Sequence, residues 1–309
     1  MSIARSILLS ASKNSWLEGQ MSRRAFARRA VKRFMPGERV EDALDAARPL
    51  ADAGLGSIVT QLGENLTSLT DAEAVRDHYL GVYDLIKARG LPSWPSVKPT
   101  QLGLDLSPEA CLTHLLAIAQ KAEATGSWVW IDMEDSSYVD RTLELFRKVR
   151  AKHEKVGLCL QSYLRRTPAD LAALMELKPA IRLVKGAYAE PAHVAFPEKR
   201  DVDLAYFDLA ERLLEAAREG GAFPVFGTHD IPLLDRIVRR AADLGVKDGA
   251  YEIHMLYGIR AADQRALAAQ GRKVRTLISY GAHWFPWYMR RLAERPANVW
   301  FVVKSLLPG

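Results

Sequence analysis

Residues 180–188 have the sequence Ala180-Ile181-Arg182-Leu183-Val184-Lys185-Gly186-Ala187-Tyr188. The stretch begins like a buried strand and then continues with a lysine, a glycine and an aromatic residue, where a core strand would end in turn residues alone. A lysine at the end of a buried strand is costly unless it is paired or used. We therefore expect Lys185 to serve a function.

Short apolar runs alternate with amphipathic stretches through most of the chain. The expected strands are 57–62, 96–100, 128–133, 156–161, 181–185, 224–229, 251–256 and 274–279. Helical periodicity covers roughly 71–89, 107–124, 137–153, 167–177, 203–219, 231–244, 261–269 and 284–295. Alternating strands and helices imply a parallel sheet, and eight βα units favour its closure. The sequence therefore predicts an α/β protein, a TIM-like (β/α)8 barrel.

The 309 residues are more than the roughly 250 of a typical barrel, which leaves room for an N-terminal arm. We expect a basic helical arm over residues 1–50 and a catalytic barrel over residues 51–309. The two cysteines, Cys111 and Cys159, have no spacing suited to a disulfide framework or a zinc site. No run approaches the roughly 20 apolar residues needed to span a bilayer, and the expected compartment is the cytoplasm.

The basic charge of the chain is concentrated in the arm. Residues 1–40 hold nine Lys and Arg against two Glu, whereas the rest of the chain holds 34 basic and 35 acidic residues. The arm could be an amphipathic helix touching anionic lipid at the inner face of a membrane, an organellar transit peptide, or a helix packed on the barrel. The barrel shows no basic patch, so we expect no nucleic-acid partner.

Functional groups in a barrel gather where strands end and βα loops begin. The polar residues at the expected strand ends are Gln61, Glu64, Lys98, Asp132, Glu134, Gln161, Arg182, Lys185, Thr228, His229 and Asp230, with His254 inside strand 7. Any one of them could form a structural pair in the barrel interior. The repetition of this feature at six strand ends indicates a site.

Composition and position leave three chemistries open. Lys185 could form a Schiff base with a carbonyl substrate or a pyridoxal cofactor. Asp132, Glu134, His229 and Asp230 could hold a metal, although no two of them share a recognised ligand spacing. Strand 5 could instead hold an anionic cofactor such as a flavin; because no GxGxxG sequence is present, a Rossmann-type site is not expected.

The segment 284–296 favours the third possibility. Its sequence is Trp284-Phe285-Pro286-Trp287-Tyr288-Met289-Arg290-Arg291-Leu292-Ala293-Glu294-Arg295-Pro296, a helical pattern with one proline near its start and another at its end. Arg290 and Arg291 could form a solvated face paired with Glu294 at helical spacing. Alternatively, the two guanidinium groups could hold a carboxylate.

At this point the chain resembles the proline dehydrogenases, FAD-dependent (β/α)8-barrel enzymes, and in particular their monofunctional bacterial members. The matching segments are Val97–Gly103, Ile131–Ser136, Leu160–Thr167, Arg182–Tyr188, Gly227–Asp230, Met255–Gly258 and Tyr288–Pro296. They occur in the same order as in the family and cover roughly residues 55–305. Each is weak alone, and together they are specific.

The resemblance implies that FAD binds at the strand ends through Gln161, Arg182, Val184, Lys185, Gly186, Ala187, Thr228, His229 and Glu294. It implies a substrate site of Lys98, Asp132, Leu256, Tyr257, Leu277, Arg290 and Arg291, where arginine and lysine bind the carboxylate. The implied reaction is hydride transfer from L-proline to flavin N5, which yields 1-pyrroline-5-carboxylate in proline catabolism. A membrane quinone would accept the electrons, and contact with the membrane would give the basic arm a role.

Two positions depart from the family pattern. Leu277 stands where the family usually has a tyrosine that packs on the substrate, so hydroxyproline or another cyclic imino acid is an alternative substrate. His254 stands where the family often has glutamine, near the flavin. From the residues alone, a Schiff-base lyase using Lys185 remains a second alternative.

Overall fold

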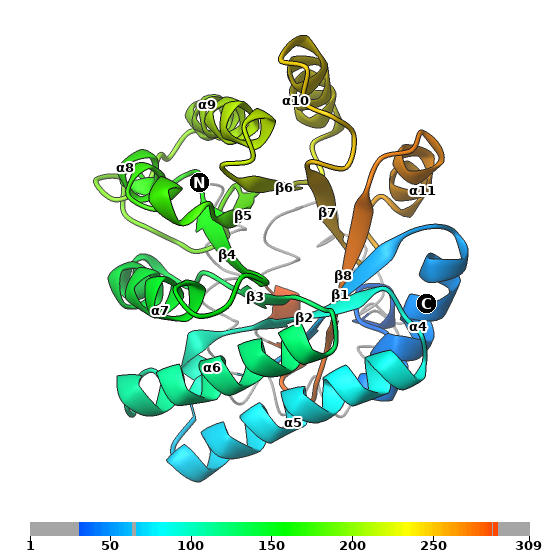
Figure 1. The fold of residues 1–309 in the computed structure, drawn as a ribbon, viewed down its shortest axis with the longest axis vertical. Helices are drawn as coiled ribbons and strands as arrows, with labels where there is room; N and C mark the ends of the chain where they lie inside the picture. Colours follow the sequence, from blue (N-terminus) through cyan, green and yellow to red (C-terminus); the bar gives the residue numbers. More distant parts are fainter. Residues whose placement is uncertain (1–30, 64–65, 286, 290–309) are drawn as a thin grey trace, which may run out of the picture.

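Eight parallel strands form a closed barrel with the order β1-β2-β3-β4-β5-β6-β7-β8. The structure is a computed structural model that describes residues 31–63, 66–285 and 287–289 (Figure 1). The strands are β1 Gly56–Gln61, β2 Ser93–Val97, β3 Val129–Ile131, β4 Val156–Gln161, β5 Ala180–Val184, β6 Phe223–Gly227, β7 Glu252–Leu256 and β8 Val274–Tyr280. The predicted fold class is confirmed.

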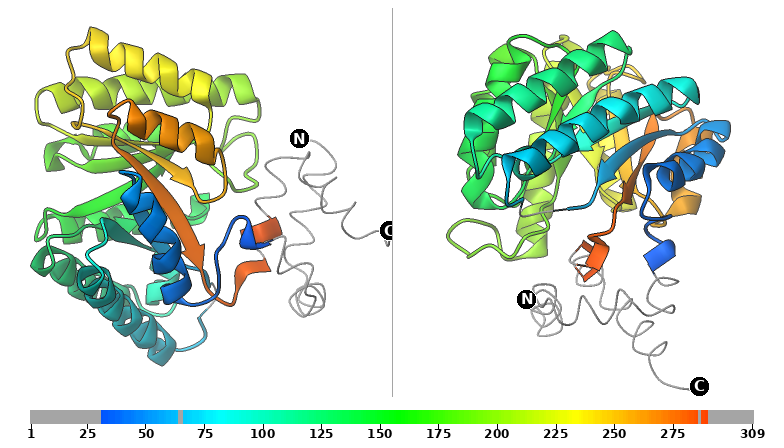
Figure 2. Two further views of the ribbon diagram at one scale, coloured as in Figure 1. Left: turned by 90° about the vertical axis from the view of Figure 1, so that its right-hand side faces the viewer. Right: turned by 90° about the horizontal axis from the view of Figure 1, so that it is seen from below.

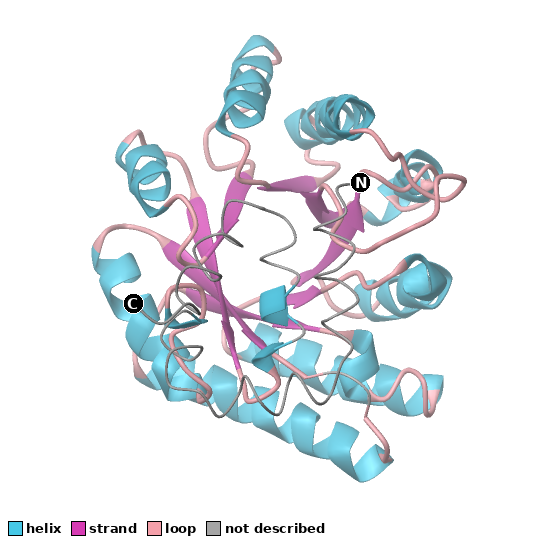
Figure 3. Ribbon diagram, turned by 180° about the vertical axis from the view of Figure 1, so that it is seen from behind, coloured by secondary structure: helices cyan, strands magenta, loops and turns pink. Residues whose placement is uncertain are grey.

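Helices surround the barrel, as Figures 1 and 3 show from opposite ends. They are α4 Val40–Asp52, α5 Leu69–Ala88, α6 Pro108–Ala124, α7 Val139–Arg150, α8 Thr167–Ala172, α9 Lys199–Arg218, α10 Ile231–Asp243 and α11 Ala261–Ala269. Local sequence sets their starts: the hydroxyl of Ser107 accepts a hydrogen bond from the amide of Ala110, and Pro108 occupies the first turn of α6.

Helix α4 covers the junction where β8 meets β1 (Figure 2). Its Ala43, Leu44 and Ala47 are buried in one apolar cluster with Val59 of β1 and Ile278 of β8. The helix crosses residue 50, the position at which the sequence analysis separates arm from barrel. Because residues 1–30 lie outside the described part of the chain, that boundary stays a prediction.

Strand β2 lies about three residues earlier than the sequence pattern predicted. Pro99 fixes a φ suited to a helical first turn, and residues Pro99–Leu102 form a 3-10 turn instead of continuing the strand. Lys98 therefore follows the strand instead of lying within it.

The junction between β1 and β2 is completed by a helix side chain. The two strands are in register from Ser57 and Ser93 to Val59 and Pro95. Beyond that point the hydroxyl of Tyr79, on α5, accepts a hydrogen bond from the amide of Gln61 at 3.0 Å and donates one to the carbonyl of Ser96 at 2.9 Å.

The amino-terminal half of the barrel interior is filled with apolar side chains. Ile58, Trp130, Ala180 and Val225 form a buried cluster, against which Trp94, Trp128, Phe223 and Leu277 pack. Trp130 fits there because β4 has a glycine next to it, and a Cβ at Gly157 would lie 2.5 Å from the indole ring. This packing leaves a cavity at the carboxyl ends of the strands.

No helix among the described residues is both long enough and apolar enough to cross a membrane.

Candidate functional site

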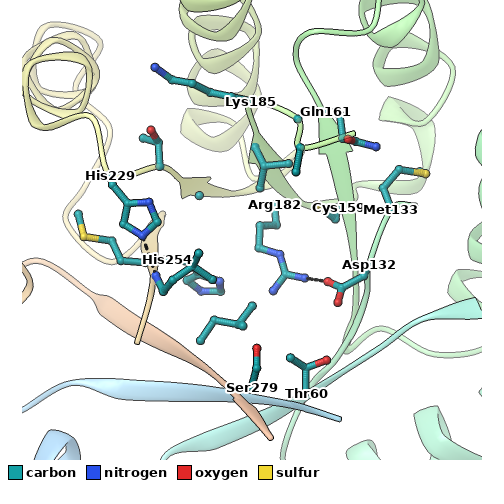
Figure 4. Close-up of a pocket in the computed structure, with 18 of the residues that line it drawn as sticks. Thr60, Asp132, Met133, Cys159, Gln161, Arg182, Lys185, His229, His254 and Ser279 are labelled. Atoms are coloured by element: carbon teal, nitrogen blue, oxygen red, sulfur yellow. Dashed lines mark hydrogen bonds and ion pairs between the residues drawn. The ribbon is translucent and has the colours of Figure 1, made fainter. Parts of the chain in front are cut away.

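A cavity of about 730 Å³ lies at the carboxyl ends of the strands, within the size range of about 300–1,000 Å³ that is common for ligand pockets. Its lining includes residues from, or directly after, all eight strands: examples are Thr60, Lys98, Asp132, Gln161, Arg182, Gly227, His254 and Ser279. Figure 4 labels six of these, Thr60, Asp132, Gln161, Arg182, His254 and Ser279. The barrel thus brings together side chains that are far apart in the sequence.

Most of the residues that the sequence analysis proposed for the site line this one cavity. They are Lys98, Asp132, Gln161, Arg182, Val184, Lys185, Gly186, Ala187, Thr228, His229, Leu256 and Leu277. Tyr257 is not among the lining residues; it packs against the apolar cluster beneath α4. Arg290, Arg291 and Glu294 lie outside the described residues, so their placement stays a prediction.

Arg182 lies deep in the cavity, with 3% of its surface exposed. Its Nη2 forms an ion pair with Asp132, across the barrel on the β3 side, and donates a hydrogen bond to the hydroxyl of Ser96 at 2.9 Å. That hydroxyl in turn donates to Asp132 at 2.9 Å. The guanidinium also lies over the face of Trp130, with 5.2 Å between its carbon and the ring centroid. The charge is therefore fixed from three sides.

Lys185 directly follows the carboxyl end of β5, where two carboxylates contact it. Its Nζ lies 2.5 Å from Oδ1 of Asp203 and 2.8 Å from Oδ2 of Asp230. Burial acts to raise the pKa of Asp230, but the hydrogen bond and charge of Lys185 outweigh it and the pKa is lowered. Lys185 therefore places a cationic group at the edge of the cavity.

The backbone that follows Lys185 takes a shape that favours glycine. Gly186 has a φ of +115°, and a Cβ there would lie 2.2 Å from the ring of Tyr163. The Lys-Gly sequence at the strand end therefore has a steric cause, since the chain turns closely past an aromatic ring beside the cavity.

His229 and Gln161 are oriented by backbone groups. Nε2 of His229 accepts a hydrogen bond from the amide of Leu256 at 2.9 Å, so in this arrangement Nε2 carries no proton. Nε2 of Gln161 donates to the carbonyl of Glu134 at 2.7 Å. The carboxylate of Glu134 is itself fixed by the amide and hydroxyl of Thr100.

His254 lies on the interior face of β7 and is 3% exposed. Burial lowers its pKa to about 4, so the imidazole is neutral near pH 7. Its Nε2 lies 3.2 Å from the carboxylate of Glu252, which is also bonded to Arg275. Hydrogen bonds and charge from these two partners lower the pKa of Glu252 against the opposing effect of burial.

Sequence reasoning missed Thr60, Cys159 and Ser279, which also line the cavity. Cys159 and Ser279 each lie two positions from a proposed site residue, Gln161 and Leu277, on the same strand. Because side chains alternate along a strand, residues two apart face the same side. That period was a usable signal for extending the site along each strand.

Four buried polar atoms in the cavity lining have no hydrogen-bond partner among the described residues. They are Thr60 Oγ1, Arg182 Nη1, His254 Nδ1 and Ser279 Oγ. A buried polar atom without a partner is costly, typically by about 1–3 kcal/mol, so such atoms are usually satisfied by water or a ligand. The set contains both donors and acceptors, which suits a polar ligand with both kinds of group.

Metal binding finds no support in the described residues, where no group of three or more His, Cys, Asp and Glu side chains is arranged to hold an ion. Of the candidates, Glu134 bonds Thr100, and Asp132 and Asp230 pair with cations of the chain.

Comparison with known proteins identifies relatives of this chain. The sequence model described as "Proline dehydrogenase" matches residues 43–304. Proline dehydrogenase 1 of Bacillus subtilis is 38% identical over 280 residues, which cover 91% of each chain. Proline dehydrogenase of Deinococcus radiodurans is 38% identical over 284 residues, which cover 90% of each chain.

Among solved structures, the proline utilization A (PutA) protein of Bdellovibrio bacteriovorus inactivated by N-propargylglycine has a TM-score of 0.81 to this chain. The sequences are 24% identical, and the match covers 88% of this chain and 33% of the longer protein. This likeness establishes the fold alone.

Proposed function

The chain belongs to the proline dehydrogenase family of oxidoreductases, and we propose that it oxidises L-proline to 1-pyrroline-5-carboxylate with FAD as cofactor and a quinone as electron acceptor. The observation that carries the proposal is the cavity at the strand ends. It is lined by twelve residues that were proposed from the sequence, and it contains buried donors and acceptors without a partner among the described residues. The twelve residues are Lys98, Asp132, Gln161, Arg182, Val184, Lys185, Gly186, Ala187, Thr228, His229, Leu256 and Leu277.

The side of the cavity formed by β4, β5 and β6 would hold the cofactor. The contacting residues would be Gln161, Arg182, Val184, Lys185, Gly186, Ala187, Thr228 and His229, with Glu294 from the C-terminal segment. Lys185 supplies a cation suited to phosphate groups, and Arg182 supplies one suited to a ring that becomes more negative on reduction. Nη1 of Arg182, which has no partner among the described residues, offers a donor to such a ring.

The opposite side would hold the substrate. Lys98, with Arg290 and Arg291, would bind the carboxylate, while Leu256 and Leu277 would face the apolar part of the ring. Asp132 would act indirectly, because its ion pair fixes Arg182. Tyr257 packs beneath α4 and would support the end of β7. Bound FAD supplies the acceptor for the hydride, and the protein contributes by orienting the substrate C–H bond toward it.

The Schiff-base alternative for Lys185 is disfavoured by its surroundings. Its Nζ would have to leave its contacts with both Asp203 and Asp230 to attack a carbonyl. For the substrate, relatives named proline dehydrogenase support L-proline over a hydroxylated ring, although Leu277 does line the cavity. Membrane contact through residues 1–40 and a cytoplasmic location at the membrane remain predictions.

Visible spectra of the purified protein, recorded without oxygen, test the proposal. We expect flavin bands that bleach on addition of L-proline. Bleaching only with trans-4-hydroxy-L-proline would change the substrate assignment. A colourless protein that takes up no added FAD, together with borohydride trapping of a carbonyl compound on Lys185, would overturn the proposal in favour of the lyase.

A further inference from the structure

His254 lies between the apolar barrel interior and the cavity. The residue one step below it on the same face of β7 is Glu252, and the residue one step above is Leu256. Its ring meets Trp130 edge-on, with 5.5 Å between the centroids. Because His254 is buried and closely packed, few groups can reach its two ring nitrogens, and each nitrogen can be considered in turn.

One nitrogen of His254 is committed to a carboxylate. Nε2 lies 3.2 Å from Oε2 of Glu252, and the lowered pKa values of both residues make the pair a neutral imidazole beside an ionised carboxylate. A carboxylate only accepts hydrogen bonds, so the proton must sit on Nε2. Nδ1 is then an acceptor, and it has no partner among the described residues.

Glu252 is fixed on its other side, which keeps this arrangement in place. Arg275 on β8 donates to it through Nε at 2.8 Å, and its Nη1 donates to the carbonyl of Pro92 at 2.8 Å. Arg275 also lies over the ring of Trp94. The carboxylate therefore cannot turn away from His254 without losing the bonds to Arg275.

Arg182 offers the complementary donor. Its Nη2 is used by Asp132 and Ser96, while its Nη1 is buried without a partner. Arg182 and His254 pack on the same indole, that of Trp130, the first over its face and the second edge-on. Figure 4 shows the two side chains next to one another at the base of the cavity. A free donor and a free acceptor thus share one buried region.

We propose that His254 is a positioning residue for Arg182: its Nδ1 accepts a hydrogen bond from Nη1 of Arg182, directly or through one bound water. Glu252, His254 and Arg182 then form a chain that, with Asp132 on the far side, holds the guanidinium in one orientation at the base of the cavity. The functional part of this inference rests on the proposed flavin, whose ring would feel the positive charge.

The reduction potential of the bound flavin tests this role. His254→Leu removes the acceptor, so Arg182 loses the proposed contact at Nη1, is oriented less firmly and stabilises the reduced ring less. We expect a more negative midpoint potential and a flavin dissociation constant about tenfold higher, which corresponds to about 1.4 kcal/mol. His254→Gln retains an acceptor oxygen and should restore both quantities to near the values of the unsubstituted protein.

His114→Leu is the matched control. His114, on α6, is also a buried histidine, but its Nδ1 bonds the carbonyl of Leu102, at the end of the 3-10 turn, and it does not line the cavity. Loss of that ring should leave the flavin potential unchanged. If His254→Leu has an unchanged potential, or if His254→Gln shifts it as far as His254→Leu does, the proposal is wrong, because volume and not the acceptor would then matter.

A second measurement needs neither the leucine variant nor flavin. Nitrogen-15 spectra of the imidazole groups, with the His254 signals assigned by their loss in His254→Gln, should show a proton on Nε2 and none on Nδ1 at pH 7. A protonated Nδ1 would overturn the proposal. A protein that binds no flavin would instead refute the proposed function while leaving this tautomer measurable.

Discussion

Lys185 at the end of β5 donates a hydrogen bond to Asp230 at the start of α10, with 2.8 Å between Nζ and Oδ2. The other carboxylate oxygen of Asp230 accepts from the amide of Leu233 in the first turn of α10. One carboxylate therefore caps the helix and fixes the lysine. The cation and the positive end of the helix lie together beside the cavity, an arrangement suited to phosphate groups.

Replacement of this lysine should weaken cofactor binding. In Lys185→Met the cation is lost, and Lys199 is the cation that still pairs with Asp203 and Asp230. We expect the flavin dissociation constant to rise at least about tenfold, measured by fluorescence titration. Arg76→Met removes a cation that pairs with Asp77 on the surface of α5, away from the cavity, and should leave affinity unchanged. Equal affinity in Lys185→Met and the unsubstituted protein would contradict the assignment.

Asp132 should matter more to stability than a surface aspartate does. Asp132→Asn leaves the buried Arg182 without its counter-charge, and we expect the free energy of unfolding to fall by about 2–4 kcal/mol in urea titrations. Asp84→Asn breaks the pair with Lys121 on the surface, where the aspartate is 62% exposed, and should cost about 0.5 kcal/mol or less. Similar losses in the two variants would show that the buried charge is compensated in another way.

Two glycine-to-alanine substitutions should have opposite effects on stability. In Gly157→Ala the new methyl group would lie 2.5 Å from the ring of Trp130, and displacement of this buried indole should cost about 1–3 kcal/mol. Gly81, inside α5, has no atom within 4 Å of such a methyl group. Gly81→Ala should therefore stabilise the protein by about 0.5–1 kcal/mol, because alanine is the better helix former. Thermal unfolding compares them, and destabilisation by both would refute the local explanation.

Acid should destabilise the protein partly through His254. Its pKa falls from an ordinary 6.5 to about 4 in the folded protein because the ring is buried, so the unfolded chain binds the proton more readily between those values. Stability is therefore lost as the pH falls from about 6.5 to 4, by up to about 3 kcal/mol from this group.

His254→Gln removes this titration and retains the pair of Glu252 with Arg275. Urea titrations between pH 4 and 7 should show a shallower loss of stability in the variant. Parallel pH profiles of the two proteins would contradict this prediction, because His254 would then bind its proton equally well in the folded protein and in the unfolded chain.

The alternation of strands and helices was enough to predict the barrel, because each βα unit carries its own period. Strand β4 and helix α11 have the predicted bounds, Val156–Gln161 and Ala261–Ala269. Strand β2 was displaced because its apolar residues include Pro95 and are followed by Pro99, so periodicity alone could not locate its end. Helix α8 is shorter than predicted and ends at Ala172, before a 3-10 turn at Met175–Leu177.

The site was predictable as a set of strand ends and not as a set of pairs. Strand ends converge in any closed barrel, so the polar residues at these ends were expected to form one site. The ion pair of Asp132 with Arg182 depends on the conformation of a long side chain that reaches across the interior, and no sequence period specifies that. The partners of Lys185 illustrate the same point, since Asp203 lies on α9, outside the strand ends that were considered.

The hydroxyl of Tyr79 between β1 and β2 couples a helix to the cooperativity of the barrel. The amide of Gln61 and the carbonyl of Ser96 are joined through the side chain of Tyr79 on α5. If the two strands separated here while α5 stayed in place, both backbone groups would lose their hydrogen bonds. Strand separation here and release of α5 therefore belong to one unfolding unit. In hydrogen exchange, the Gln61 amide would be protected to the same extent as the buried turns of α5.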